Sequence, residues 1–139
     1  MFETLFDVKN SLGQSFVRYA LKEKTNGAAK VKCFWINGRN GEFKRKLNLL
    51  EENFAYGCKQ HYEGNKIELQ IVSIPQRTIT IERNEIEWKA FCKIKEQEAR
   101  LEEINVEVKR RFGLQHVSRV EIRGECLESL DKIIEVITF

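Results

Sequence analysis

The sequence predicts an α+β fold, in which a mostly antiparallel sheet of about five strands has helices packed on one face. Two stretches, residues 30–49 and 66–82, alternate apolar and polar side chains as strands do. Two others, residues 2–24 and 84–112, repeat apolar side chains at steps of three and four, which is typical of amphipathic helices. With 139 residues and 42% hydrophobic side chains, the chain is expected to form a single domain over residues 1–139.

The first predicted element is a helix over residues 2–24. It ends at Thr25-Asn26-Gly27, because Asn and Gly readily adopt the left-handed backbone that stops a helix. A short helix is expected within residues 50–60. A last helix follows Gly124 and places four apolar side chains on one stripe, namely Leu127, Leu130, Ile134 and Ile137.

The strands are predicted as two hairpins and a single strand. In residues 30–49, Val31, Cys33 and Trp35 share one face, and Gly38-Arg39-Asn40-Gly41 is the turn. The second hairpin begins after Gly64-Asn65 and turns at Pro75-Gln76. Its apolar faces are Ile67, Leu69 and Ile71 on one strand and Ile79 and Ile81 on the other, and a further strand is expected over residues 117–123.

The longest predicted element is a helix of about 29 residues over positions 84–112. Asn84 is its expected cap, and Glu96 and Arg100 are one of its favourable i,i+4 pairs. At 1.5 Å per residue it would run about 43 Å, so part of it is expected to project and form a homodimer contact. The alternative is a helix packed on its own sheet. The proposed seam is Phe91, Ile94, Glu98, Leu101, Asn105, Val108 and Phe112.

Positive charge is concentrated on the first hairpin. The chain has 24 Lys and Arg against 21 Asp and Glu, yet residues 30–46 carry six cations and only one carboxylate, Glu42. A cationic hairpin with exposed aromatic rings suits a phosphate backbone, and it also suits an acidic protein surface. The alternative is a solvated edge strand that lysines protect from aggregation. The predicted binding residues are Lys30, Lys32, Phe34, Trp35, Arg39, Lys44, Arg45 and Lys46.

The predicted function is a non-catalytic accessory or regulatory protein. Phosphate-loop, dinucleotide-binding, hydrolase-elbow and zincin motifs are missing from the sequence, and no cofactor is expected. The partner would be a protein or nucleoprotein complex, or nucleic acid itself, contacted through the basic hairpin and the long helix. Small size and the lack of enzyme motifs fit a phage or mobile-element inhibitor.

The alternative prediction is a nucleic-acid-processing enzyme. The triplet Glu68-Leu69-Gln70 on a middle strand, in the predicted order of elements, resembles the restriction-endonuclease-like nucleases. That resemblance implies a Mg²⁺ site with Glu63 and Glu68 as ligands and Gln70 near the attacking water. The chain departs from the family pattern because the expected Asp is absent, Asp7 and Asp131 being its only aspartates. Side chains that simply face water explain the same alternation. His61 is a separate acid–base candidate.

The four cysteines are predicted to be reduced thiols in a cytoplasmic protein. The N-terminus MFETLFDVKN is unlike a secretory signal, and no apolar run approaches the ~18 residues of a membrane span, so no membrane contact is expected. Cys58 and His61 have the spacing of half a zinc site, but the other half is missing. A buried thiol beside a surface imidazole is therefore favoured over a metal site. Cys33, Cys92 and Cys126 have apolar neighbours.

Overall fold

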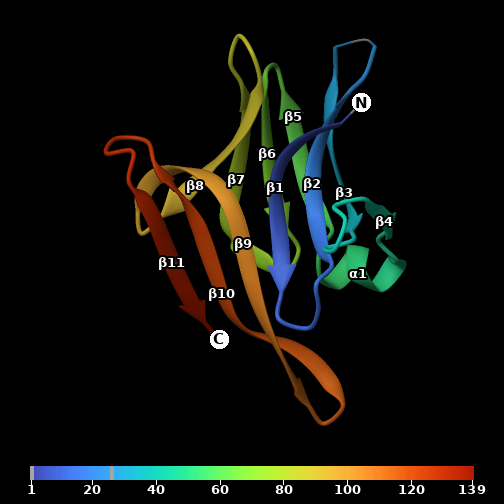
Figure 1. The fold of residues 1–139 in the computed structure, drawn as a ribbon. Helices are drawn as coiled ribbons and strands as arrows, with labels where there is room; N and C mark the ends of the chain where they lie inside the picture. The colour runs from blue at the N-terminus through green and yellow to red at the C-terminus, as the bar shows by residue number, and fades with distance from the viewer. Residues whose placement is uncertain (1, 26) are drawn as a thin grey trace.

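The computed structural model describes residues 2–25 and 27–139, without the side chains at 111, 114 and 115, and it consists almost entirely of β-strands (Figure 1). All the described strands belong to one sheet. A single short helix, α1 (Leu49–Phe54), lies between the fourth and fifth strands. The strands are β1 (Phe2–Asn10), β2 (Phe16–Glu23), β3 (Ala29–Ile36), β4 (Phe43–Lys46), β5 (Cys58–Glu63), β6 (Lys66–Ile71), β7 (Ile74–Arg83), β8 (Trp88–Ile94), β9 (Gln97–Arg111), β10 (Leu114–Cys126) and β11 (Lys132–Thr138).

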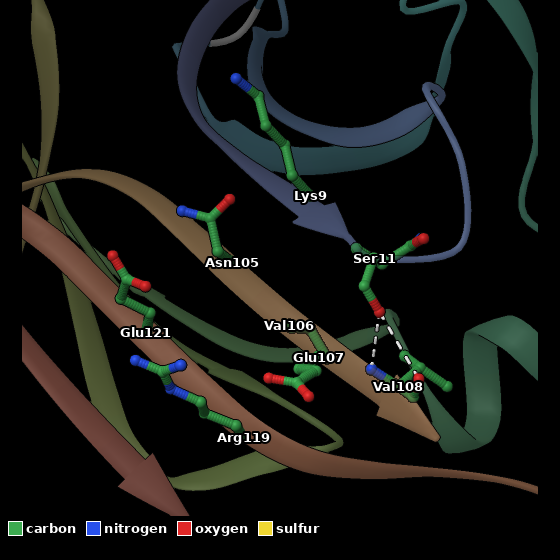
Figure 2. A pocket seen from close by; sticks show the side chains of 9 residues that line it. Lys9, Ser11, Asn105, Val106, Glu107, Val108, Arg119 and Glu121 are labelled. Carbon is green, nitrogen blue, oxygen red and sulfur yellow. Dashed lines mark hydrogen bonds between the residues drawn. The ribbon is translucent and has the colours of Figure 1, made fainter. Parts of the chain in front are cut away.

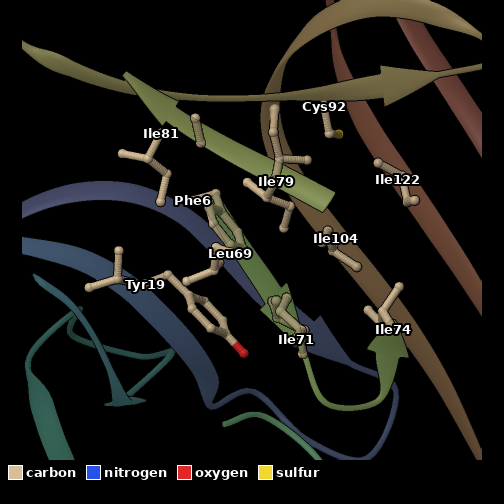
Figure 3. Close-up of a cluster of buried hydrophobic side chains, with 14 of the residues drawn as sticks. Phe6, Tyr19, Leu69, Ile71, Ile74, Ile79, Ile81, Cys92, Ile104 and Ile122 are labelled. Atoms are coloured by element: carbon tan, nitrogen blue, oxygen red, sulfur yellow. The ribbon is translucent and has the colours of Figure 1, made fainter. Parts of the chain in front are cut away.

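The long strand β9 organises the sheet. The strand order is β4-β3-β2-β1-β9-β8-β7-β6-β5, and the neighbours are antiparallel except for the parallel pair β1 and β9. One edge of β9 pairs first with β8, at residues 97–100, and then with β1, at residues 103–106. Its other edge pairs with β10, which in turn pairs with β11. The sheet curls, so that β1 and β2 lie across the core from β6 and β7 (Figures 1 and 3).

The core fills the inside of this curled sheet (Figure 3). The rings of Phe6 and Tyr19 stack in parallel with their centroids 4.6 Å apart, and both are almost completely buried. Leu69 and Ile81 approach from the opposite side, and Ile104 comes from β9. Truncating an aromatic ring in such a core costs roughly 3–5 kcal/mol of unfolding free energy. Among the described residues, no polar or charged residue is buried.

The predicted α+β fold is wrong, because the described residues form a nearly all-β structure without any long helix. Residues 2–24, predicted as a helix, are the β1–β2 hairpin. Buried Phe6 and Val8 alternate with outward residues in β1, and Val17, Tyr19 and Leu21 do so in β2. These buried residues have even numbers in β1 and odd numbers in β2, because the turn shifts the alternation by one position. Taken together, the two alternations resemble the spacing of apolar residues in a helix. Asn26 of the predicted helix stop lies outside the described residues.

The predicted long helix over residues 84–112 is also wrong, because this stretch contains the antiparallel pair β8 and β9. Trp88, Ala90, Cys92 and Ile94 alternate inward along β8. The turn is made by Lys95 and Glu96, with φ values of 50° and 64°. These residues lack the Asn-Gly signal that usually marks such a tight turn. The predicted homodimer contact loses its basis, since its seam residues do not form one face of a helix.

Of the other predicted elements, some are confirmed and some are wrong. The hairpin within residues 30–49 is confirmed as β3 and β4, and the strand over 117–123 lies within β10. Strands β6 and β7 pair as predicted, but the chain turns between Ile71 and Ile74 and Pro75 lies inside β7. The predicted last helix is strand β11, and residues 50–60 hold part of α1 followed by β5. In the part of the chain described, no helix has the length and hydropathy needed to cross a bilayer.

Candidate anion-binding surface

The outer side of β1–β4 carries a cluster of lysines and phenylalanines. Residues directly opposite each other on neighbouring strands point to the same face of a sheet. The pairings Phe2↔Lys22↔Lys30, Ala20↔Lys32 and Arg18↔Phe34↔Lys46 therefore place these side chains on one surface, opposite the core. We call this surface the Lys–Phe face and define it by Phe2, Lys22, Lys30, Lys32, Phe34, Phe43 and Lys46.

Three phenylalanine rings form a row on the Lys–Phe face. Phe34 lies in the middle, with its centroid 5.5 Å from that of Phe2 and 5.7 Å from that of Phe43. Neighbouring rings are tilted by 59° and 55°. The outer two rings are largely open to solvent, with Phe2 50% and Phe43 60% exposed. Large rings left in water beside one another are available for stacking against a ligand.

The lysines of this face repel one another. The pKa of Lys32 is lowered, first because of the neighbouring charge of Lys30, then because of slight burial, with Lys22 and Lys24 adding to the effect. Among the described residues, no carboxylate lies within ion-pair distance of Lys22, Lys30, Lys32 or Lys46. A cluster of unpaired like charges favours binding of an anion, since the anion would relieve the repulsion.

The structure separates the predicted binding residues into three sets. Lys30, Lys32, Phe34 and Lys46 come together on the Lys–Phe face. Trp35 and Arg45 are opposite each other on the other side of β3 and β4, and the Arg45 guanidinium lies 5.4 Å from the centre of the Trp35 ring. The same ring packs edge-on against Tyr56 at 5.2 Å, so Trp35 is not a free anchor.

The remaining two predicted cations lie at the turn end of the hairpin. Arg39 Nε donates to Gln14 Oε1 at 3.2 Å, and Lys44 Nζ donates to Ser15 Oγ at 3.3 Å. Both partners belong to the loop between β1 and β2. Arg39 and Lys44 are exposed, but these contacts direct them toward that loop, away from the lysine pair of β3.

Arg45 has a structural role, because it holds α1 against the sheet. Its guanidinium donates to both carboxylate oxygens of Glu51, at 2.7 and 2.9 Å. This contact is the main reason why the pKa of Glu51 falls to about 2. The same carboxylate completes a capping box with Asn48 at the start of the helix. The helix exposes its apolar side chains and buries none of its residues, so these polar contacts are what fix it.

Three members of the Lys–Phe face were not among the predicted binding residues. Phe2 and Lys22 were assigned to a helix, and Phe43 belongs to the predicted hairpin but was left out of the set. The alternation of Val17, Tyr19 and Leu21 with outward residues was the signal for a strand. Even that signal does not say which strand lies alongside. Only the pairing of β2 with β3 brings Lys22 opposite Lys30.

The structure also places the residues of the alternative predictions. Glu68 and Gln70 point outward from β6, opposite His61 and Lys59. Glu63 is 3.8 Å from His61, both being well exposed, and Glu68 is 3.9 Å from Lys66. No group of three or more potential metal-ligating side chains exists among the described residues. The strand–helix order that supported the nuclease resemblance is missing, because the chain is nearly all β.

Cys58 and His61 do not converge. They lie three residues apart on β5, and a strand directs side chains at odd separations to opposite faces. Cys58 is half-buried and contacts the core, whereas His61 is exposed. A Cys-x-x-His spacing brings both side chains to one metal ion only where the backbone turns. Residues 58–61 instead form part of an extended strand.

A hollow of about 390 Å³ lies where β1 ends against β9 and β10 (Figure 2). Ser11 fixes the end of β1 there, since its Oγ accepts from the Val108 N–H at 3.0 Å. The hollow is open, and the charged residues that line it are Lys9, Arg119, Glu107 and Glu121 (Figure 2). Its two cations and two carboxylates balance, so the hollow lacks the excess of positive charge found on the Lys–Phe face.

The fold and surface together define an all-β domain with an aromatic, cationic face. The chain matches the family model DUF4833, described as a domain of unknown function, over residues 6–136, and it belongs to that family. No curated protein and no solved structure matches the chain significantly.

Proposed function

We propose that this domain is a non-catalytic binding module that docks on single-stranded nucleic acid through the Lys–Phe face. The observation that carries the proposal is the row of Phe2, Phe34 and Phe43 beside unpaired lysines. Proteins that bind single strands combine a cationic track for the phosphates with aromatic rings on which bases stack. Both components are present here on one surface of four neighbouring strands.

The aromatic rings favour a single strand over the other anionic partners. A duplex keeps its bases stacked on one another and offers phosphates without free base faces. An acidic protein surface would use the lysines, but it would not require a row of exposed rings. The unpaired bases of a single strand use both parts of the face.

The wider role remains that of an accessory or regulatory protein acting on a nucleoprotein complex in the cytoplasm. The alternative nuclease function gains no support, because Glu63 and Glu68 lie on an open, solvated strand face beside His61 and Lys66.

The proposal is tested by fluorescence anisotropy with labelled oligonucleotides. The full-length chain is titrated into single-stranded DNA, single-stranded RNA and a duplex of equal length, at several salt concentrations. We expect tighter binding to single strands and a linear fall of log affinity with log salt. The double reversal Lys30→Glu/Lys32→Glu should abolish binding. The control Lys59→Glu/Lys93→Glu makes the same change in net charge on other strands and should retain most of it.

Three results would reject the proposal. One is an absence of binding at low salt, and another is equal loss in the two double reversals, which would indicate a response to net charge alone. The third is equal affinity for duplex and single strand, which would remove the role given to the rings.

A further inference from the structure

The edge of β3 away from β2 is shared by two partners. At residues 34–36 it pairs with β4 through ordinary strand hydrogen bonds. Nearer the start of β3, the neighbour is β5, and side chains replace the strand ladder. The Gln60 amide binds both backbone groups of Val31: it accepts from the N–H at 2.8 Å and donates to the carbonyl at 3.1 Å. The Tyr62 hydroxyl donates to the Gly27 carbonyl at 3.3 Å.

Two cysteines extend this side-chain contact between β3 and β5. Cys33 lies two residues beyond Val31, and Cys58 lies two residues before Gln60. The Gln60 Nε2 that binds Val31 also lies 3.8 Å from Cys58 Sγ, and Cys33 Sγ lies 3.8 Å from the Tyr56 carbonyl oxygen, just before β5. The contacts Gly27–Tyr62, Val31–Gln60 and Cys33–Tyr56 run in opposite directions along the two strands, so Cys33 and Cys58 are neighbours across this contact. Both are half-buried, whereas Cys92 and Cys126 are buried elsewhere.

We propose that Cys33 and Cys58 are an oxidation site, at which a reversible disulfide joins β3 to β5. The bond would replace a side-chain contact with a covalent one at the place where the strand ladder is missing. This inference does not depend on the proposed function. It does concern the strand that carries Lys30, Lys32 and Phe34, because Cys33 lies between the last two.

The two thiols differ in a way that assigns their order of reaction. The interaction between the two neighbouring thiols raises the pKa of Cys33 and lowers that of Cys58. Burial further raises the pKa of Cys33. The thiolate is the reactive form, so Cys58 attacks first.

The oxidant is a low-molecular-weight disulfide such as glutathione disulfide. The Cys58 thiolate attacks one of its sulfurs, forms a mixed disulfide and expels one glutathione thiolate. Cys33 then loses its proton to solvent and attacks the Cys58 sulfur, which forms the Cys33–Cys58 bond and expels the second glutathione thiolate. One molecule of glutathione disulfide is thereby reduced to two glutathiones, and the two protein thiols lose one proton each.

Mass spectrometry of the intact chain tests the proposal. The protein is equilibrated in glutathione buffers of increasing disulfide content, quenched with acid, alkylated and digested with trypsin. We expect the chain to lose the mass of two hydrogens, and a single cross-link to join the peptides of residues 33–39 and 47–59. The melting temperature should rise by roughly 5–10 °C and return with dithiothreitol, because the bond closes a loop of about 25 residues.

The variants separate this site from general thiol oxidation. Cys33→Ser should stop at a mixed disulfide on Cys58, and Cys58→Ser should show neither species. A wild-type chain that remains reduced in a buffer dominated by glutathione disulfide would overturn the proposal. So would cross-links to Cys92 or Cys126, or a mixed disulfide as the final wild-type product. The wild-type peptide map decides the question even if a serine variant does not fold.

Discussion

Two outer regions of the same sheet differ in whether their cationic side chains are paired with carboxylates. On the Lys–Phe face, the register places Lys22 opposite Lys30, with Lys32 nearby, and the described residues include no carboxylate paired with them. On the outer side of β9–β11, cations alternate with carboxylates. We call this second region the paired face and define it by its ion pairs, Arg100–Glu102, Arg123–Glu121, Lys132–Glu102 and Lys132–Glu125.

The difference shows which charges are free to act on a ligand. Exposed ion pairs contribute only about 0–1 kcal/mol to stability, but each pair cancels the field of its cation. The lysines of the Lys–Phe face have no such partners. Their mutual repulsion slightly destabilises the folded state, as the lowered pKa of Lys32 indicates. A sequence with nearly balanced charge therefore folds into a molecule with one neutralised region and one cationic region.

The largest expected effect comes from removing the unpaired cations. Lys22→Gln/Lys30→Gln/Lys32→Gln should weaken single-strand binding on the order of 100-fold at 0.1 M salt and reduce the salt slope by about 2, since each phosphate contact on a single strand contributes about 0.7. The matched variant Arg100→Gln/Arg123→Gln/Lys132→Gln removes the same charge from the paired face. Anisotropy titrations should show it losing less than a tenth as much. Similar losses of affinity in both triple variants would contradict the distinction between the Lys–Phe face and the paired face.

A second prediction concerns the rings. Phe43→Ala should weaken binding by about 1–3 kcal/mol while leaving the salt slope unchanged, because stacking is not electrostatic. Its cost in stability should be small, since Phe43 is 60% exposed. Leu50→Ala on α1 is the control, with a side chain that is 72% exposed and lies off the phenylalanine row. An altered salt slope in Phe43→Ala would mean that the ring only positions lysines.

A third prediction uses the ion pair behind the hairpin. The folded pKa of Glu51 is about 2, below its ordinary value of 4.5, so the pair stabilises α1 fully above pH 4.5 and loses this contribution as the pH falls toward 2. Tryptophan fluorescence should report the release, because Arg45 covers Trp35. In Glu51→Gln, the fluorescence step in this window should be missing. A step that persists in the variant would assign the change to another carboxylate.

The smallest expected effect comes from the turn that joins β8 to β9. Lys95 and Glu96 both have positive φ, which costs side-chain-bearing residues free energy. Lys95→Asn/Glu96→Gly should stabilise the chain by about 1–2 kcal/mol in urea unfolding. Binding to a single strand should stay the same, because the turn lies away from the Lys–Phe face. A change in affinity would show that binding follows overall stability.

The sequence predicted the strands whose alternation is clean. Ile67, Leu69 and Ile71 of β6 are buried as expected, and the two faces of β3 were assigned correctly. It failed for residues 2–24 and 84–112, because in each the alternations of two joined strands resemble helical spacing. The turn at Lys95 and Glu96 has no glycine signal, and Gly13 in the turn between β1 and β2 was not enough to mark a hairpin. The segment Ile104-Asn105-Val106-Glu107-Val108 does alternate strictly, but it lies within the longer stretch whose overall spacing predicts a helix.

The candidate site was predicted in part for the same reason. Lys30, Lys32, Phe34 and Lys46 follow from one hairpin, and hairpin neighbours are close in sequence. Arg45 and Trp35 belong to that hairpin too, but the parity of the strand sends them to the opposite side. The Phe2 ring reaches Phe34 across β2 from a strand far away in the chain.

By itself, the sequence determined where short strands alternate and that β3 and β4 form a cationic hairpin, since these are properties of neighbouring residues. Tertiary structure decided that residues 2–24 and 84–112 are strands, that Lys22 lies beside Lys30, and that Cys33 meets Cys58. Each of these depends on which strand pairs with which. Partners in a sheet are distant along the chain, so burial of the whole apolar face, and no local pattern, selects them.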